Sequence, residues 1–273
     1  MKVAFQGEQG AYSESAVYQF FGSNAQVKPC REFRDVFESV QKQETSFGVV
    51  PVENSLEGSV NQNYDLFLQY DLKVCGEVIV KIEHCLIVNP GTSLADIKAV
   101  YSHPQALAQC RTFLERSKFE LIPTYDTAGS VKMLKENSFR NAAAIASERA
   151  AKLYGMQILA NDIADNHENY TRFFVLSQED AQFSGKDKTS IIFSAAHSPG
   201  SLYHALGEFA RRGINLTKIE SRPTKQKPWE YNFYLDFEGH RSEARCVEAL
   251  KGLEKFAAFV KILGSYPKAN RLP

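Results

Sequence analysis

The first 177 residues alternate short apolar runs, typical of strands, with segments whose apolar residues recur every three to four positions, typical of helices. We predict strands at residues 3–7, 47–53, 98–104, 119–125, 141–147 and 156–160. We predict helices at residues 13–22, 33–43, 105–117, 126–137 and 148–155. Such alternation is typical of an α/β domain with a largely parallel sheet.

A long β-rich stretch at residues 72–88 interrupts this alternation and is followed by a turn at 89–96. The interruption predicts two lobes within the first domain. We expect one lobe to contain residues 1–78 together with 168–178, and the other to contain residues 79–167. A cleft between two such lobes is a natural place for a ligand.

A polar segment at residues 177–188 has turn character and no apolar period, which is typical of a linker. After it the pattern restarts as strand, helix, two strands, helix and strand, which is the ferredoxin-like plan. The predicted domains are residues 1–178, a linker at 179–187 and a second domain at 188–267. The expected fold class is α/β: a two-lobed domain with mostly parallel sheets, followed by a ferredoxin-like βαββαβ domain.

With 273 residues and 44% hydrophobic content, the chain is long enough for two or three compact units with real cores. The 32 basic residues balance the 32 acidic ones, so no overall field attracts nucleic acid or an anionic membrane. A small-molecule ligand fits this balance better. No uninterrupted apolar span reaches membrane length, and the first residues do not have the pattern of a signal segment.

The five cysteines are odd in number, scattered and without a C-x-x-C pair, so zinc binding and redox chemistry are not expected. This usage is typical of a reduced compartment. Together with the missing signal pattern, it predicts a cytoplasmic protein. The cysteines are Cys30, Cys75, Cys85, Cys110 and Cys246.

Polar segments follow several of the predicted strands, and open α/β sheets bind ligands at the carboxyl ends of their strands. The first such segment, "GEQGAYSE", contains Gly7 and Gly10, which permit close backbone approach, and Ser13, which can cap the next helix. Free amide N–H groups at a helix start favour an anion. The alternative is an ordinary capped turn, because a lone G-x-x-G is a weak signal.

The segments "PVENSLEGS" and "YSHPQALAQC" follow two further strands. The first offers a carboxylate, an amide and two hydroxyls, a set that can hold carboxylates and hydroxyls. The second places Ser102 before a helix, with Gln105 and Gln109 one turn apart on one face, so that both amides can reach one ligand. The alternatives are a polar loop and a capped helix with solvated glutamines.

The stretch "NYTRFF" places Thr171 and Arg172 at the entrance of an aromatic strand. The alternative is an edge strand in which Thr171 fills a β-branched position and Arg172 points to water. His103 is a candidate general base, although it precedes a proline, and His84 is expected in the core. The histidines do not have the spacing of a metal site, and the sequence contains no nucleotide-binding motif, so neither a metal nor a cofactor is expected.

In this order, and ahead of a ferredoxin-like tail, "VVPVENSLEGSV", "SHPQALAQC" and "NYTRFF" resemble the signatures of the prephenate dehydratase family. The resemblance covers nearly the whole chain. It implies a periplasmic-binding-protein-like catalytic domain that converts prephenate to phenylpyruvate without a cofactor, losing water and carbon dioxide, in L-phenylalanine biosynthesis. Arogenate dehydratase, which acts on the aminated substrate, is the nearest alternative. A non-enzymatic amino-acid sensor or solute receptor is a more distant one.

The resemblance also implies roles for individual residues. The implied catalytic residues are Thr171, Asn54, Ser102 and Gln109. The implied substrate-binding residues are Tyr12, Ser13, Glu53, Ser55, Gln105, Arg172 and Phe173. Because prephenate is a dianion, Arg172 and the helix start after Gly10 are expected to meet its carboxylates, whereas Glu53 is expected to orient other groups. One departure is visible, since many members have proline at the position of Glu8 and threonine or serine at that of Ala11.

The tail resembles an ACT domain, an amino-acid sensor that binds its ligand between subunits, in the motifs "SPGSLYHAL" and "GINLTKIESRP". This implies L-phenylalanine as an allosteric inhibitor and a homodimer or homotetramer, with no nucleic-acid or membrane partner. Glu220–Pro223 is expected to act as a turn at the ligand. The implied phenylalanine-binding residues are Gly200, Ser201, Leu202, Asn215, Leu216, Glu220, Ser221, Arg222 and Pro223.

Overall fold

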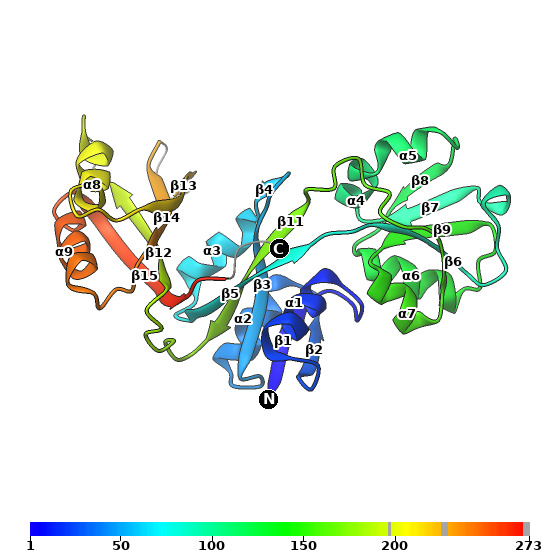
Figure 1. The fold of residues 1–273 in the computed structure, drawn as a ribbon, viewed down its shortest axis with the longest axis horizontal. Coiled ribbons are helices and arrows are strands. Elements are labelled where there is room, and N and C mark those ends of the chain that lie inside the picture. Colours follow the sequence, from blue (N-terminus) through cyan, green and yellow to red (C-terminus); the bar gives the residue numbers. More distant parts are fainter. Residues whose placement is uncertain (196–197, 225–228, 270–273) are drawn as a thin grey trace. The chain divides into compact units, whose positions relative to one another are not determined.

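The computed structural model describes residues 1–195, 198–224 and 229–269, and the chain forms two compact units (Figure 1). The first unit contains Met1–Gln69 and Val78–Phe173, and the second contains Tyr70–Glu77 and Phe174–Pro273. The bounds predicted for the two domains, the lobes and the linker stay predictions.

The first sheet has the strand order β2-β1-β3-β11-β5, with the short β4 paired to β3. β1 pairs in parallel with both β2 and β3, and its three central residues are buried, as the apolar run predicted. The strands are β1 (Lys2–Gln6), β2 (Gln26–Cys30), β3 (Phe47–Asn54), β4 (Gly58–Ser59), β5 (Lys73–Lys81) and β11 (Tyr170–Ser177). The helices of this part of the chain are α1 (Tyr12–Phe21), α2 (Phe33–Gln41) and α3 (Asn61–Gln69).

The second sheet has the strand order β10-β6-β9-β7-β8. β7 pairs in parallel with β8 and β9, whereas β6 runs antiparallel to β9 and β10. The strands are β6 (Cys85–Val88), β7 (Ala99–Ser102), β8 (Glu120–Pro123), β9 (Ala142–Ala146) and β10 (Gln157–Ala160). The helices are η1 (Leu94–Asp96), α4 (Pro104–Gln109), α5 (Arg111–Glu115), α6 (Thr127–Glu136) and α7 (Glu148–Tyr154).

The C-terminal part confirms the βαββαβ prediction. Its four-stranded antiparallel sheet has the order β13-β14-β12-β15, so β13 is an edge strand. Helices α8 and α9 lie beside each other against this sheet and bury an apolar core that includes Phe209, Leu235 and Phe237 (Figure 1). The elements are β12 (Asp187–Ala195), α8 (Ser201–Ala210), β13 (Leu216–Pro223), β14 (Tyr231–Glu238), α9 (Ala244–Leu253) and β15 (Ala257–Pro267).

The helix predicted at 105–117 is broken in the structure. Cys110 leaves the helical region at φ −113° and ψ 21°, and separates α4 from α5. The reason is tertiary: the Asp165 N–H donates to the Gln109 carbonyl at 2.7 Å, and the Asp165 carboxylate accepts from the Thr112 N–H at 3.0 Å. A distant loop thus supplies the hydrogen bonds that a continuous helix would have made itself.

Two local predictions were wrong. Ser13 does not cap α1, because the extended residue Ala11 is its N-cap and Ser13 lies inside the first turn. Glu220–Pro223 do not form a turn, because the pairing of β13 with β14 continues to the Pro223–Tyr231 register. The strand β2 and the helix α3 were not predicted.

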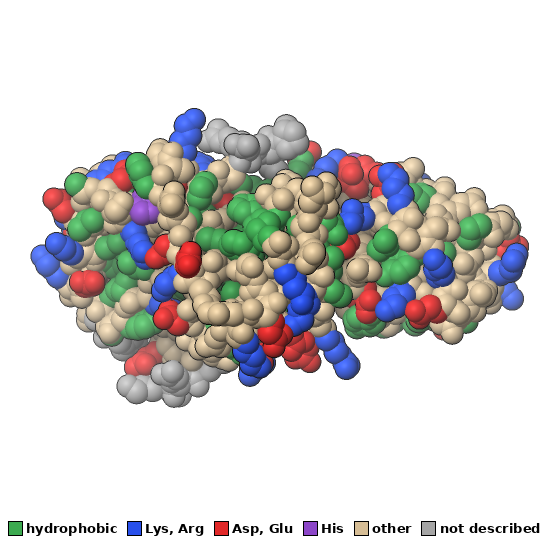
Figure 2. All heavy atoms as spheres, turned by 90° about the horizontal axis from the view of Figure 1, so that it is seen from below, with side chains coloured by type: hydrophobic (Ala, Val, Ile, Leu, Met, Phe, Trp, Pro, Cys, Tyr) green, Lys and Arg blue, Asp and Glu red, His purple; other side chains and the backbone are tan. Residues whose placement is uncertain are grey.

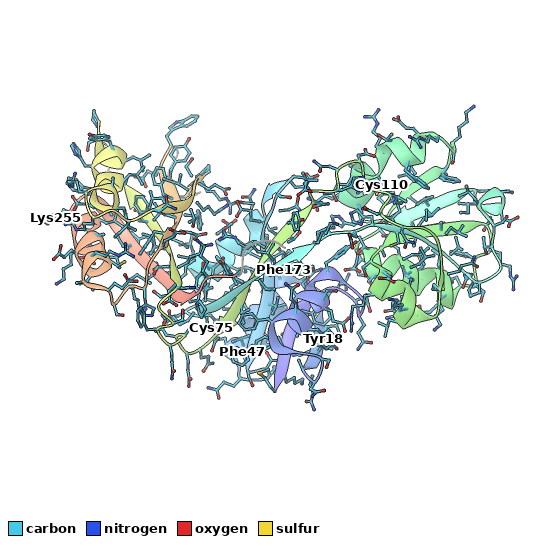
Figure 3. All side chains as sticks on the ribbon, viewed as in Figure 1. Tyr18, Phe47, Cys75, Cys110, Phe173 and Lys255 are labelled. Atoms are coloured by element: carbon cyan, nitrogen blue, oxygen red, sulfur yellow. The ribbon has the colours of Figure 1, made fainter. Side chains whose placement is uncertain are left out.

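The structure also shows where the charged side chains and the cysteines lie. Acidic and basic side chains are interspersed over the face seen in Figure 2. All five cysteines are free, and Cys75 and Cys110, labelled in Figure 3, belong to different units. Within the described ranges no helix combines the length and the apolar character needed to cross a membrane.

Candidate active site

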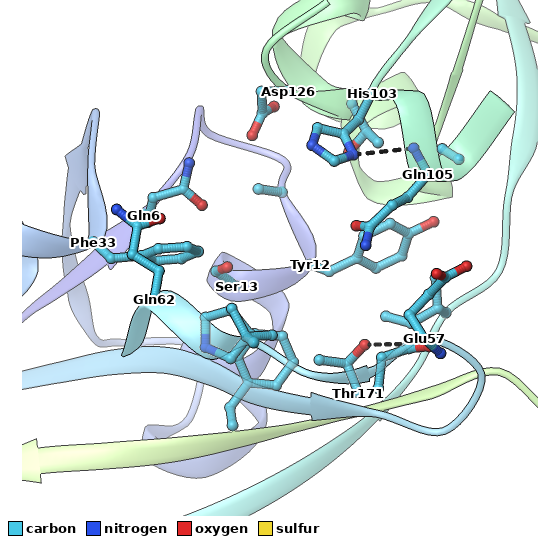
Figure 4. A pocket seen from close by; sticks show the side chains of 18 of the residues that line it. Gln6, Tyr12, Ser13, Phe33, Glu57, Gln62, His103, Gln105, Asp126 and Thr171 are labelled. Carbon is cyan, nitrogen blue, oxygen red and sulfur yellow. Dashed lines mark hydrogen bonds between the residues drawn. The ribbon is translucent and has the colours of Figure 1, made fainter. Parts of the chain in front are cut away.

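A cleft of about 510 Å³ lies in the first unit, between loops that follow strands of its two sheets (Figure 4). From the first sheet's side, β11 contributes Thr171 and the start of α1 contributes Tyr12 and Ser13. From the second sheet's side, His103 and Gln105 come from the start of α4. The predicted site residues that line the cleft are Tyr12, Ser13, Asn54, Gln105, Gln109, Thr171 and Phe173.

Thr171 accepts a hydrogen bond from the side chain of Asn54, at 3.0 Å from Nδ2 to Oγ1. The orientation of Asn54 is settled by its surroundings, because its Oδ1 accepts from the backbone N–H groups of Leu56 at 2.9 Å and Glu57 at 3.0 Å. Since Nδ2 therefore faces Thr171, the threonine oxygen is an acceptor on that side. The hydroxyl proton of Thr171 therefore remains available to donate a hydrogen bond to a ligand in the cleft.

Three carboxamides continue this arrangement, and we call Asn54, Asn169 and Gln109 the carboxamide network. Asn54 Nδ2 donates to Asn169 Oδ1 at 2.7 Å, and Asn169 Nδ2 donates to Gln109 Oε1 at 2.9 Å. Gln109 Nε2 lies 3.3 Å from a carboxylate oxygen of Glu57. Its three members are neutral, so the network fixes which atoms donate and which accept without placing a positive charge beside the cleft.

Arg172 does not line the cleft, which differs from the prediction that it meets a ligand carboxylate. Its guanidinium is buried and lies 3.0 Å from the carboxylate of Glu53, which also stays out of the cleft. Strand alternation explains the position of Arg172, because Thr171 and Phe173 point to one face of β11 and Arg172 points to the other. Glu53 precedes Asn54 on β3 and does not line the cleft.

Ser102 and Ser55 also lie outside the cleft lining, in contrast to their predicted roles. Ser102 is fully buried and its hydroxyl donates to the Ile145 carbonyl at 2.6 Å, so it joins β7 to β9. Ser55 donates to the Glu168 carbonyl and accepts from the Tyr170 N–H, both at 2.9 Å. These hydroxyls hold the backbone behind the cleft.

His103 caps helix α4, and Ser102, which was predicted to lie before a helix, is the residue that precedes it. Its Nδ1 accepts from the Gln105 N–H at 3.3 Å, and Pro104 occupies the first helical position (Figure 4). A proline there is favourable because its missing N–H has no intrahelical partner to lose. His103 also lines the cleft. Burial lowers the pKa of its imidazole.

Two amides of the first loop are used within the protein, whereas the free amides predicted at the start of α1 stay a prediction. The Gly10 N–H donates to the buried carboxylate of Glu14 at 2.8 Å, and the Gly7 N–H donates to the Cys30 carbonyl at 2.9 Å. Gly10 has φ +92°, and a Cβ there would lie 2.8 Å from Ala150 Cα. The close approach that the glycine permits is therefore to another part of the protein.

The same loop makes the ionic contacts of the first unit that join its beginning to α6 and α7. Glu8 lies 3.1 Å from Lys132 and accepts from the Tyr125 hydroxyl at 2.9 Å. Glu14 lies 2.9 Å from Arg149. We call these five residues the first-loop cluster. Glu8 occupies the position where many members of the resembled family have proline.

Sequence reasoning missed several residues of the cleft. His84 was expected in the core and is buried, yet it also lines the cleft between Tyr12 and Gln109. Asp126 lines the cleft, caps α6 by accepting from the Gly129 N–H at 2.7 Å, and has its pKa raised mainly by burial. The "DTAG" pattern is a helix-start signal that could have located Asp126, and Asn169 begins the "NYTRFF" motif, whereas no local pattern indicates that His84 lines the cleft.

No lysine or arginine stands among the cleft-lining side chains of the described residues, and the carboxylates there are Glu57 and Asp126. Nor does this part of the chain gather three His, Cys, Asp or Glu side chains in a metal-binding arrangement. The arrangement can donate hydrogen bonds from carboxamides and hydroxyls to an anionic ligand and to a leaving oxygen.

The predicted amino-acid site lies on two elements of the C-terminal sheet domain. Gly200 has φ +82° and forms the N-cap of α8, whose first residue, Ser201, donates to the Ser198 carbonyl at 2.9 Å. The Asn215 carbonyl accepts from the Glu238 N–H at 2.9 Å and so begins the pairing of β13 with β14. The further predicted residues are Leu202 in α8, and Leu216, Glu220, Ser221, Arg222 and Pro223 in β13.

Family models match both parts of the chain. The model described as Prephenate dehydratase matches residues 3–181. The chain belongs to the prephenate dehydratase family. The model described as ACT domain matches residues 189–255, so this dehydratase carries a C-terminal ACT domain, and both parts of the resemblance are confirmed.

Individual relatives bear dehydratase names. A bifunctional chorismate mutase/prephenate dehydratase of Aquifex aeolicus is 45% identical over 98% of this chain and 74% of its own. An arogenate dehydratase/prephenate dehydratase of Arabidopsis thaliana is 44% identical over 98% of this chain and 73% of its own. Both names include prephenate dehydratase, and the second also names arogenate dehydratase.

Two solved structures have the same fold over the whole chain. The prephenate dehydratase of Arthrobacter aurescens in complex with L-Phe has a TM-score of 0.91 at 34% identity, covering 100% of this chain and 92% of that one. A protein described as a quorum-quenching acylase, GqqA, has a TM-score of 0.90 at 33% identity, covering 99% of each chain. The same fold is thus shared by proteins that are described with different activities.

Proposed function

We propose that the protein converts prephenate to phenylpyruvate and that Thr171 assists the departure of the ring hydroxyl. The observation that carries this proposal is the bond from Asn54 to Thr171, which leaves the threonine proton available to the cleft. In the reaction the bond to the ring carboxylate breaks and releases carbon dioxide. Its electron pair enters the ring, the C–O bond of the hydroxyl breaks, and the hydroxide takes up a proton to leave as water.

Thr171 contributes a hydrogen bond that strengthens as negative charge develops on the departing oxygen. A threonine hydroxyl is a weak acid, so its contribution depends on being held in the right direction. The bond from Asn54 Nδ2 holds it, and Asn54 is itself held by two backbone amides. A preorganised donor of this kind costs no reorientation when the reaction occurs.

The two carboxylates of prephenate would be bound by neutral donors, because the lining carries no lysine or arginine among the described residues. Gln105, Ser13 and Tyr12 line the cleft around the space left for the ring (Figure 4). Phe173 supplies an apolar wall. The buried Arg172, paired with the partly exposed Glu53, would act from behind by fixing β11 against β3.

Arogenate is a second candidate substrate, and the name of the Arabidopsis relative favours testing it. The decisive experiment incubates the purified full-length protein with prephenate and follows phenylpyruvate, and in parallel with arogenate and follows phenylalanine. We expect the higher kcat/KM with prephenate. Turnover of arogenate alone would replace the proposed substrate, and turnover of neither would contradict the dehydratase proposal.

L-phenylalanine is the proposed allosteric inhibitor, because the similar Arthrobacter structure was determined with L-Phe and the ACT domain is shared. We propose that the ligand binds where the start of α8 and strand β13 of neighbouring subunits meet, in a homodimer or homotetramer. Its inhibition then reflects different affinities for two arrangements of the protein, with a coupling of roughly 1–3 kcal/mol.

This proposal is tested by titrating L-phenylalanine against the dehydratase rate. Asn215→Ala and Ser221→Ala should each need more phenylalanine for half inhibition while keeping the uninhibited rate. Lys255→Ala, an exposed change in the same domain outside both motifs, is the matched control (Figure 3). Equal inhibition of all three variants and the unchanged protein would place the effector elsewhere.

We also propose that the enzyme is cytoplasmic and works without a metal or cofactor. Five free cysteines support a reduced compartment. Prolonged dialysis against a strong chelator should leave the rate unchanged. A rate that is lost with the metal and returns when it is added back would contradict the metal-free proposal.

A further inference from the structure

His84 lies between two residues of the cleft and touches both with its ring nitrogens. Nδ1 is 3.0 Å from the Tyr12 hydroxyl, and Nε2 is 3.0 Å from Gln109 Oε1. The ring is buried, with 2% of its surface exposed. The function proposed above assigns this histidine no role.

The proton on this ring can be placed because the carboxamide network has only one consistent direction. Backbone N–H groups can only donate, so the two that meet Asn54 Oδ1 fix its Nδ2 toward Asn169. Asn169 then presents its own Nδ2 to Gln109 Oε1. A carbonyl oxygen consequently faces His84 Nε2, and that nitrogen must carry a proton to make the bond.

The Tyr12 contact by itself does not decide the protonation of Nδ1, because a hydroxyl can donate to this nitrogen or accept from it. The Tyr12 hydroxyl has one proton and two acceptors within reach, the Glu83 carbonyl at 2.6 Å and His84 Nδ1 at 3.0 Å. Burial lowers the pKa of His84 and raises that of Tyr12 well above its ordinary value, so both groups stay neutral. The ionisable groups that act on this pair are Cys85, Cys110, Glu83 and Asp162.

We propose that His84 is a positioning residue for the dehydration, holding the Gln109 carboxamide in one orientation and, through Asn169 and Asn54, holding the donor on Thr171. The proposal rests on the function assigned to Thr171 above. Without the Nε2–H, Gln109 loses one of the contacts that fix its orientation and can turn to present an NH₂ group to the Asn169 NH₂ group. Two donors then face each other, and the strain passes to Asn54 and to Thr171.

Two variants of the full-length protein distinguish the hydrogen bond of His84 from the space that its side chain fills. His84→Leu keeps an apolar side chain and removes both ring nitrogens, and we expect kcat to fall about 10²-fold, the effect of small misplacement at a reacting group. His84→Gln places an amide N–H near the position of Nε2, and it should recover most of that loss. A His84→Gln variant as slow as His84→Leu overturns the proposal.

A double variant tests whether His84 acts through Thr171. In a protein that already carries Thr171→Val, replacing His84 with leucine should cost about threefold or less, because the hydroxyl it orients is gone. The same loss as in the unchanged background would show an independent effect and would overturn the proposal.

Nitrogen NMR of the histidine rings in the unchanged protein gives a readout that needs neither substrate nor variant. We expect His84 to show a protonated Nε2 and an unprotonated Nδ1 at neutral pH. A ring protonated only on Nδ1, or on both nitrogens, would overturn the assignment. Failure of the proposed function would appear differently, as an unchanged protein that turns over neither prephenate nor arogenate.

Discussion

The carboxamide network and the first-loop cluster are two polar regions of the same unit that work by different physics. Asn54, Asn169 and Gln109 are neutral, and each orientation fixes the next, beginning from two backbone amides. The first-loop cluster is ionic, and Glu8 and Lys132 are partly exposed. Neutral donors can keep a fixed orientation beside an anionic substrate without a charged partner. Partly exposed ion pairs join distant segments but add little to the free energy of unfolding.

The largest effect is expected at the end of the network. Thr171→Val keeps the shape of the side chain and removes the hydroxyl, so kcat should fall by about 10²-fold or more. Thr171→Ser, which keeps the hydroxyl, should retain far more activity. Steady-state kinetics with prephenate measure both, and Thr112→Val, an exposed change in α5, is the control. A valine variant with near-normal kcat removes Thr171 from the mechanism.

The next effect concerns the buried member of the first-loop cluster. Glu14→Ala leaves the Gly10 N–H buried without its acceptor and separates Arg149 from its carboxylate. The free energy of unfolding should fall by about 1–3 kcal/mol, measured by urea denaturation. Glu148→Ala breaks an exposed pair with Lys152 in α7 and should cost only about 0.5 kcal/mol. Equal losses would mean that burial does not distinguish these glutamates.

The next prediction concerns His84, which contacts the carboxamide network, and the pH dependence of the free energy of unfolding. Burial lowers the pKa of folded His84 below its ordinary 6.5, so the unfolded chain binds the proton first as pH falls. The contribution of His84 to stability is fully present above pH 6.5 and is lost as pH falls through the folded pKa. In that window the slope is at most about 1.4 kcal/mol per pH unit. Urea titrations should show a shallower fall for His84→Gln, and identical slopes would contradict this.

The smallest effect is expected at Glu8 and Lys132. Their side chains are 29% and 39% exposed, so a double-mutant cycle with Glu8→Gln and Lys132→Met should give a coupling below about 1 kcal/mol. The coupling should weaken further at high salt, because exposed charges are screened. A larger coupling that salt does not change would mean that this pair behaves like the buried network.

Most of the first sheet, most of the second sheet and the whole βαββαβ plan could be predicted from the sequence. The apolar pattern is a local property: the continuous apolar runs of β1 and β9 are buried at consecutive positions, and the pattern at the end of the chain gives the elements β12 to β15. Even the position of Arg172 was available, since side chains of neighbouring strand residues point to opposite faces. The prediction grouped Thr171 and Arg172 by their chemistry and overlooked this alternation.

The tertiary structure alone decided which polar groups meet. His84 and Gln109 are 25 residues apart, and Asn54 and Asn169 are 115 apart, so no local spacing relates them. The break of the predicted helix at Cys110 depends on Asp165, which lies on another segment. Periodicity determines which face of an element is buried, because burial is an average over many side chains. A hydrogen bond depends on one donor and one acceptor a few ångströms apart, and only the packed chain places both.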